Sequence, residues 1–336
     1  MHSLNRQTMN NRRKLNSLFK SLFILLILMP GLLQASEKTA MEWIHAMSDA
    51  MRNLNYRGNF VYMHDNQLES MSISHMKGES GEKERLLSLN GEAREVIRDD
   101  KNLTCIWPSS RKVVVDFSHK NSYSPLFIPG DIVKISQFYD INLLGHDRIA
   151  DYPAVVVQIK PKDQYRYGLV FWIGRENNLM LKSNLVNEHS EVVEQVMFTS
   201  LELLKEGEAL DVNGIPAIDK NFTMVRYHRD QETELVVAET AWYLETMPEG
   251  FQQASVLKRL NSDSGEFFHQ MVYTDGLASL SVFIEKRSSQ MSPGKTSMGA
   301  VNAFIRVMDD YSVTAIGEVP EITVKEIAES VIYRQP

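Results

Sequence analysis

The histidines are the first residues of this sequence that could do chemistry. Eight of the nine lie beyond residue 35 and are scattered along the chain: His45, His64, His75, His119, His146, His189, His228 and His269. A zinc site needs three or four ligands, which commonly come in pairs only a few residues apart. No two of these histidines have that spacing. His64 and His75 lie on adjacent predicted strands and could meet there as a polar pair, so the sequence predicts no metal site.

Two pairs of carboxylates and a single cysteine are the other reactive groups. Asp99-Asp100 and Asp309-Asp310 are consecutive, and neighbouring side chains on a strand point to opposite faces, so neither pair suits acid–base work. Cys105 shares one face of a predicted strand with Leu103 and Trp107, which favours a buried structural thiol. The motifs of serine hydrolases, metalloproteases and phosphate-binding loops are missing. The sequence therefore predicts a protein that is not an enzyme and has no cofactor.

The first 35 residues have the pattern of a cleavable signal peptide. Basic residues precede an apolar run over residues 22–29, Pro30-Gly31 interrupts it, and Ala35 is a small residue suited to cleavage. The run is shorter than the about 20 residues that span a bilayer. No cysteine stands at the cleavage point, where Ser36 follows Ala35, so a lipid anchor is not expected. We expect a soluble, exported protein cleaved near Ala35.

Removal of this segment would leave a strongly acidic protein. The chain has 36 Lys and Arg against 43 Asp and Glu, and five basic but no acidic residues lie in the first 35, so the other 301 residues carry about −12. A protein with that charge is unsuited to the phosphate backbone, and no nucleic-acid partner is expected. The length predicts two domains.

Helix and strand periodicities indicate the elements that would position a site. Residues 39–54 are predicted to form a helix that begins with a Thr39-x-x-Glu42 capping box. Alternating apolar residues from 59 to about 204, with a tight turn at Asn90-Gly91, indicate an antiparallel meander that the helix covers. A second strand-rich block ends in a helix capped by Thr323-x-x-Glu326. The predicted fold class is α+β, with an N-terminal domain over residues 36–204, a linker over 205–222 and a C-terminal domain over 223–336.

Large apolar side chains alternate along several of these strands. If the helix fills the curved sheet, they form an ordinary core. If the concavity is unfilled, they line a lipid-sized pocket, and the pattern leaves both interpretations open. The positions predicted to contact a lipid are Phe60, Tyr62, Val113, Val115, Tyr167 and Phe171.

An ordered set of motifs carries a family resemblance along nearly the whole exported chain. The motifs are Asn55-Tyr56-Arg57-Gly58-Asn59-Phe60-Val61-Tyr62, Asn90-Gly91-x-x-Arg94-Glu95-Val96-Ile97-Arg98, Asp163-x-Tyr165-Arg166-Tyr167-Gly168 with Trp172, Glu194-Gln195-x-x-Phe198, Met247-Pro248-x-Gly250-Phe251, Tyr273-x-Asp275-Gly276-Leu277 and Gly317-Glu318-Val319-Pro320. With them the chain resembles the RseB/MucB family, periplasmic negative regulators of the envelope-stress sigma factor sigma-E, or AlgU. The chain departs from the family pattern at two places, both at a predicted turn. Gly174-Arg175 follows Trp172 where relatives tend to have an Asp, and the run Leu179-Met180-Leu181-Lys182-Ser183 stands where relatives tend to have Leu-Pro before the basic residue and Ser.

The resemblance implies both a fold and a function. The N-terminal domain is expected to resemble LolA and LolB, an unclosed antiparallel β-barrel around helix, followed by a smaller α+β domain. The protein is expected in the periplasm, where it binds the periplasmic region of an RseA/MucA-like anti-sigma factor and shields it from a site-1 protease. Lipopolysaccharide or lipoprotein acyl chains would release the anti-sigma factor from the protein. The family also tends to self-associate.

Two other classes of function stay open. A periplasmic lipoprotein or lipid carrier of the LolA type would need only the half-barrel, so a further domain from about residue 223 argues against it. An envelope enzyme ranks last, because no nucleophile–base pair can be named.

Overall fold

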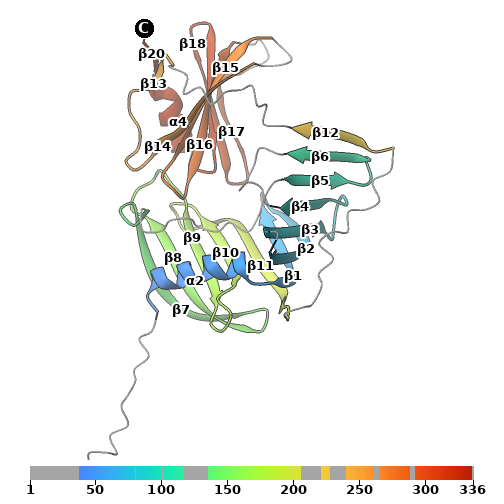
Figure 1. Cartoon of the computed structure of the whole chain (residues 1–336). Helices are drawn as coiled ribbons and strands as arrows, with labels where there is room; N and C mark the ends of the chain where they lie inside the picture. The colour runs from blue at the N-terminus through green and yellow to red at the C-terminus, as the bar shows by residue number, and fades with distance from the viewer. Residues whose placement is uncertain are drawn as a thin grey trace, which may run out of the picture. The chain divides into compact units, whose positions relative to one another are not determined.

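Figure 1 shows the chain as a computed structural model, which describes residues 38–79, 81–99, 102–116, 135–205, 221–227, 240–260, 265–287 and 292–334. The predicted signal peptide and all but the ends of the predicted linker lie outside these residues. Among the described residues, no helix is both long and apolar enough to cross a membrane. All described elements from Thr39 onward belong to one compact unit.

Helix α2 (Ala40–Asn53) begins as its sequence predicts. The Thr39 hydroxyl accepts a hydrogen bond from the Glu42 backbone N–H at 3.3 Å, and the Glu42 carboxylate accepts one from the Thr39 N–H at 2.7 Å. Two backbone donors that the first turn would leave unpaired are thereby satisfied, and the capping box is confirmed. Trp43, Ile44 and Met47 are buried on the face that meets the sheet.

A twelve-stranded sheet, here called the large sheet, surrounds this helix. Its order is β12-β6-β5-β4-β3-β2-β1-β11-β10-β9-β8-β7. The strands are β1 (Tyr56–His64), β2 (Gln67–Gly78), β3 (Gly81–Ser88), β4 (Glu95–Asp99), β5 (Leu103–Trp107), β6 (Lys112–Asp116), β7 (Tyr139–Ile149), β8 (Tyr152–Pro161), β9 (Gly168–Gly174), β10 (Met180–Val186), β11 (Val192–Leu203) and β12 (Thr223–Tyr227). All neighbours are antiparallel except β12 and β6, which are parallel. The order is open, with β12 and β7 at its two edges, and α2 lies across the strands (Figure 1). The unclosed antiparallel sheet around a helix is therefore confirmed.

The core of the large sheet is filled by α2. Ile44, Met47 and Met51 are at most 1% exposed and pack with the equally buried Phe60 and Phe171. The bulge in the pairing of β1 with β11, between Asn59 and Phe60, lies at the centre of this contact. Bulges bend a strand, which helps the sheet curve around the helix.

The second part of the chain is a smaller α+β arrangement, as expected. Its six-stranded sheet has the order β14-β15-β16-β19-β18-β17, with a two-stranded sheet β13-β20 beside it. The strands are β13 (Trp242–Leu244), β14 (Gln252–Leu260), β15 (Phe267–Thr274), β16 (Ser279–Lys286), β17 (Gly294–Met298), β18 (Val301–Met308), β19 (Tyr311–Gly317) and β20 (Val331–Tyr333), and the helix is α4 (Glu321–Ser330). Val324 and Ile327 of α4 are fully buried in a core with Met271, Val282 and Val313.

Two details differ from the sequence-based expectation. Helix α4 begins at Glu321, directly after Pro320, and has no side-chain cap. The predicted capping box from Thr323 is wrong, because the buried Thr323 hydroxyl donates instead to the Tyr165 carbonyl at 2.8 Å. Residues 223–227, which the sequence predicts to belong to the C-terminal domain, form the edge strand β12 of the large sheet. The exact domain boundaries stay a prediction.

Candidate interaction site at the junction of the two sheets

The six positions predicted to contact lipid fall in three different places. Phe60 and Phe171 are 0% exposed and belong to the core around α2. Tyr62, near the end of β1, and Tyr167, directly before β9, each have a polar partner for the hydroxyl group. Val113 is buried and Val115 half-buried on β6, near the opposite edge of the sheet. The structure therefore does not gather the six around one space, and their lipid contact stays a prediction.

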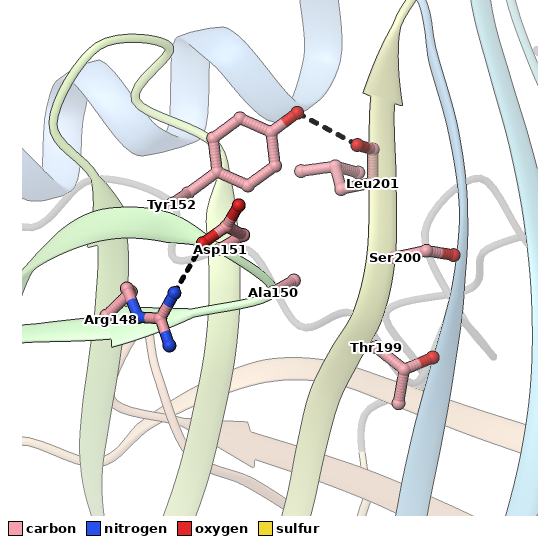
Figure 2. Close-up of a pocket in the computed structure, with 7 residues that line it drawn as sticks. All are labelled: Arg148, Ala150, Asp151, Tyr152, Thr199, Ser200 and Leu201. Carbon is pink, nitrogen blue, oxygen red and sulfur yellow. Dashed lines mark hydrogen bonds and ion pairs between the residues drawn. The ribbon is translucent and has the colours of Figure 1, made fainter.

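One pocket lies between the turn that joins β7 to β8 and strand β11 (Figure 2). Its volume is about 640 Å³, and it is lined by Arg148, Ala150, Asp151, Tyr152, Thr199, Ser200 and Leu201. The Tyr152 hydroxyl donates to the Leu201 carbonyl at 2.9 Å, and Arg148 pairs with Asp151 (Figure 2). None of the six predicted lipid positions lines this pocket. Its largely polar wall is unsuited to an acyl chain.

The predicted meeting of His64 and His75 is wrong. The register of β1 with β2 places Tyr56 opposite His75 and Gln67 opposite His64, so the two histidines lie at opposite ends of the pair. His64 lies 3.4 Å from Glu69, whereas His75 is fully buried and donates from Nδ1 to the Leu54 carbonyl at 2.8 Å. His75 thereby anchors the C-terminal end of α2.

Cys105 is half-buried, less enclosed than predicted. Burial raises the pKa of its thiol, which keeps it protonated and poorly nucleophilic. Among the described residues, no three His, Cys, Asp or Glu side chains lie close enough to hold a metal ion.

A fully enclosed charged group lies at Arg166, in the loop that precedes β9. Its side chain is 0% exposed. Nε lies 3.1 Å from Asp163 Oδ1, Nη2 lies 2.5 Å from the Glu249 carbonyl oxygen, and Nη1 lies 2.8 Å from Asp275 Oδ2. Asp163 lies in the loop between β8 and β9 of the large sheet, while Glu249 and Asp275 lie in turns of the six-stranded part. The guanidinium therefore bridges the two parts of the chain, and we call the place where they meet the junction.

Asp275 is the matching acid, and its side chain is also 0% exposed. Its Oδ1 accepts from the backbone N–H groups of Leu277 and Ala278 at 2.8 and 2.7 Å, which fixes the turn between β15 and β16. Its Oδ2 accepts from Arg166 and from the Tyr139 hydroxyl at 2.8 Å each. Both carboxylate oxygens are thus fully hydrogen-bonded, as a buried carboxylate requires.

Aromatic rings enclose the ion pair. The Arg166 guanidinium carbon lies 5.1, 5.5 and 4.9 Å from the ring centroids of Phe138, Tyr139 and Phe251. Burial, together with the Asp275 carboxylate, raises the pKa of the Tyr139 hydroxyl far above its ordinary value, so it stays a donor. Gly250 has a φ of +91°, and an added Cβ would lie 2.6 Å from the Phe138 ring. No other residue type fits this position without displacing the ring.

A second group of contacts continues the junction. Glu194 on β11 accepts from the Tyr62 hydroxyl at 2.8 Å and from the Ala300 backbone N–H at 3.3 Å. Burial, with Glu194 close by, raises the pKa of the Tyr62 hydroxyl, which therefore also stays protonated. Asn302 donates to the Tyr167 hydroxyl at 2.9 Å and to the Val319 carbonyl at 2.8 Å.

Residues 39–219 match the MucB/RseB N-terminal domain, and residues 236–332 match the MucB/RseB C-terminal domain. The chain belongs to the MucB/RseB family. It is 29% identical to the sigma factor AlgU regulatory protein MucB of Pseudomonas aeruginosa over 91% of this chain and 96% of that protein. It is 23% identical to the sigma-E factor regulatory protein RseB of Escherichia coli K12 over 86% and 89%.

Solved structures of MucB are similar to this chain as well. One is a complex of MucA and MucB from Pseudomonas aeruginosa, with a TM-score of 0.68, 28% identity and coverage of 88% of this chain and 99% of that chain. A second, MucB in complex with the periplasmic part of MucA, has a TM-score of 0.67 and 27% identity.

The junction brings together the motifs by which the sequence resembles this MucB/RseB family. Arg166 lies in the segment that matches the N-terminal domain, and Asp275 in the segment that matches the C-terminal domain. Sequence reasoning did not predict their contact, because more than 100 residues separate them. Their presence in separate motifs was the one available signal.

Proposed function

We propose that this chain is a periplasmic negative regulator of a sigma-E-type stress response. It binds the periplasmic region of an RseA/MucA-like anti-sigma factor and keeps a site-1 protease from cutting it. The observation that carries the proposal is the match to both MucB/RseB domains, together with the likeness to MucB solved in complex with MucA. In this role the protein acts by binding and not by catalysis.

The proposed location follows from the N-terminus. Residues 1–35 would direct export and be removed near Ala35, which leaves a soluble protein in the periplasm. The partner is a membrane-spanning protein whose periplasmic segment faces the same compartment. A covered segment is cut slowly because the protease needs the free form, so the fraction bound sets the rate of cleavage.

Release by lipopolysaccharide or acyl chains is part of the proposal. A ligand can change the fraction of protein bound to the anti-sigma factor only by the difference between its own affinities for the bound and free states. Moving such an equilibrium from 1:99 to 99:1 takes about 5.5 kcal/mol. The lipid would therefore have to compete directly for the partner's surface or bind a form of the protein that the partner does not.

The alternative function is a LolA-type carrier of lipid or lipoprotein. Such a carrier needs an apolar space large enough for acyl chains. Phe60 and Phe171 are instead packed against α2 in the filled core. No observation on the described residues favours the carrier over the regulator.

The test uses the periplasmic segment of the anti-sigma factor from the same bacterium. We expect saturable binding by calorimetry with a dissociation constant of about 1 µM or tighter, and slower cutting of the segment by its site-1 protease in the presence of saturating protein. The same protein unfolded by heat is the control. Absence of binding at about 100 µM would overturn the proposal. Light scattering on the same samples tests the self-association that the resemblance implies.

A further inference from the structure

The junction contains a charge that is expensive to bury. Removing an arginine and a carboxylate from water costs several kcal/mol per ion, and an apolar pair of similar volume often serves stability as well or better. Among the ion pairs between described residues, Arg166 and Asp275 form the one in which both side chains are 0% exposed. Stability alone does not explain why the junction holds a charge rather than apolar residues.

The geometry of the pair gives it directionality. Arg166 meets Asp163 on its own side and Asp275 and the Glu249 carbonyl on the other, so its planar donor groups are engaged from both parts of the chain. Apolar contacts tolerate sliding, whereas a guanidinium with fixed donors accepts one arrangement of its acceptors. Rotation of one sheet against the other would leave a buried charge without its partner.

The remaining polar contacts of the junction lack this property. The bonds of Asn302 to the Tyr167 hydroxyl and of the buried Thr323 to the Tyr165 carbonyl join neutral groups, and Glu194, which meets Ala300, is only partly buried. Water can replace such bonds at small cost when they break. The Arg166–Asp275 pair is therefore the contact that costs most to break when the junction loosens.

We propose that Arg166 is a positioning residue for recognition of the partner: its pair with Asp275 holds the two sheets in the one arrangement that binds the anti-sigma segment. The inference rests on the proposed function for the identity of the partner. While the Arg166–Asp275 pair is intact, the partner meets a preformed surface composed of both parts. When the pair is broken, that surface is divided, and the affinity for the anti-sigma segment falls.

The first measurement concerns the arrangement itself and does not require the partner. Spin labels at Lys160→Cys on β8 and Lys325→Cys on α4, both exposed positions, are introduced into the full chain with Cys105→Ser. Electron–electron resonance should give one narrow distance for the wild type and a broad distribution for Arg166→Met. Arg57→Met is the matched control, because Arg57 pairs with Glu202 in the exposed face of the large sheet, at 55% and 57% exposure. The control should stay narrow.

The second measurement is the affinity for the periplasmic segment of the anti-sigma factor. We expect Arg166→Met to weaken binding at least about tenfold and Arg57→Met to leave it unchanged. Tyr139→Phe removes one hydrogen bond to Asp275 and keeps the ring, so it serves if Arg166→Met fails to fold. It should weaken binding about threefold to tenfold with a modest broadening of the distance.

The outcomes separate the inference from the proposed function. Narrow distances and wild-type affinity in both Arg166→Met and Tyr139→Phe would overturn the positioning role. Weaker binding with an unchanged narrow distance would overturn it too, because Arg166 would then act by direct contact with the partner. A wild type that binds no segment at all would overturn the proposed function, while the distance measurement would still report whether Arg166 locks the junction.

Discussion

Phe171 lies in the middle of β9, where it is fully excluded from solvent and packs into the core around α2. Phe171→Ala should lower the free energy of unfolding by about 3–5 kcal/mol, because it leaves a cavity that the surrounding side chains cannot close. Urea unfolding followed by circular dichroism measures the loss. Phe267→Ala is the control at a side chain that is 57% exposed, and it should cost about 1 kcal/mol or less. Equal losses in the two variants would contradict the assignment of Phe171 to the core.

The burial of Phe60 and Phe171 shows where sequence reasoning stops at this scale. Strand alternation predicts which side chains share the inner face of the sheet. Whether that face encloses a pocket or a solid core depends on how far Ile44, Met47 and Met51 of α2 reach into it. This is a matter of summed volumes and helix placement, which no periodicity records.

Glu82 is a residue at which stability should depend on pH. Its Oε1 lies 2.7 Å from Arg98 Nη2 and 3.4 Å from His75 Nε2. The contact with His75 lowers the pKa of Glu82 below its ordinary value against the opposing effect of burial, and the charge of Arg98 adds to the lowering. Ionised Glu82 therefore stabilises the fold above the unfolded pKa of about 4.3, and this contribution is lost as the pH falls through the lower folded pKa.

Glu82→Gln tests this linkage. We expect the variant to be less stable than the wild type at pH 7, and the difference between their free energies of unfolding to shrink below about pH 4. Urea titrations from neutral to acidic pH measure it. Glu202→Gln, at a side chain that is 57% exposed, is the control and should show little difference at any pH. A constant deficit of Glu82→Gln across the whole range would contradict the prediction.

At the scale of the elements, the pairing of β1 with β11 depends on a close approach at Gly58. A Cβ at this position would press against the carbonyl oxygen of Ser200 and lie 3.0 Å from the Phe198 ring. Gly58→Ala must therefore separate the strands or displace a core side chain, and should cost about 1–3 kcal/mol. Gly78→Ala is the matched control, since a Cβ there meets nothing within 4 Å. We expect that control to be neutral or slightly stabilising. Thermal unfolding of both variants measures the contrast, and equal melting temperatures would be evidence against the close approach.

The elements were more predictable than the site because most of them are encoded locally. The capping box at Thr39 and the alternation along β9 each lie within a few residues, and hairpin turns set the neighbours of most strands. Two failures have non-local causes. β12 pairs in parallel with a strand far back in the sequence, without a turn to set its register. Thr323 has the form of a cap, but the Tyr165 carbonyl takes its hydroxyl.

At the scale of the whole molecule, the junction should couple the unfolding of the two sheets. Asp275→Asn keeps the shape of the side chain but removes the charge that faces Arg166, and should weaken the junction by about 2–3 kcal/mol. We expect one calorimetric transition in the wild type and an earlier, separate transition in the variant. Asp151→Asn is the control, because Asp151 is 89% exposed in its pair with Arg148. Two resolved transitions in the wild type would show that the sheets unfold independently.

Strand β12 has a consequence for how this protein is made. β6 presents Val113, Val114 and Val115 in a row, and without β12 their backbone groups would form an open edge on which another chain can add a strand. The strand that covers this edge is more than 100 residues further along the chain. During synthesis, a chain that has already built β2 to β6 must wait for residues 223–227 to emerge. Within that interval it is exposed to aggregation, and binding by a chaperone would be most useful to it then.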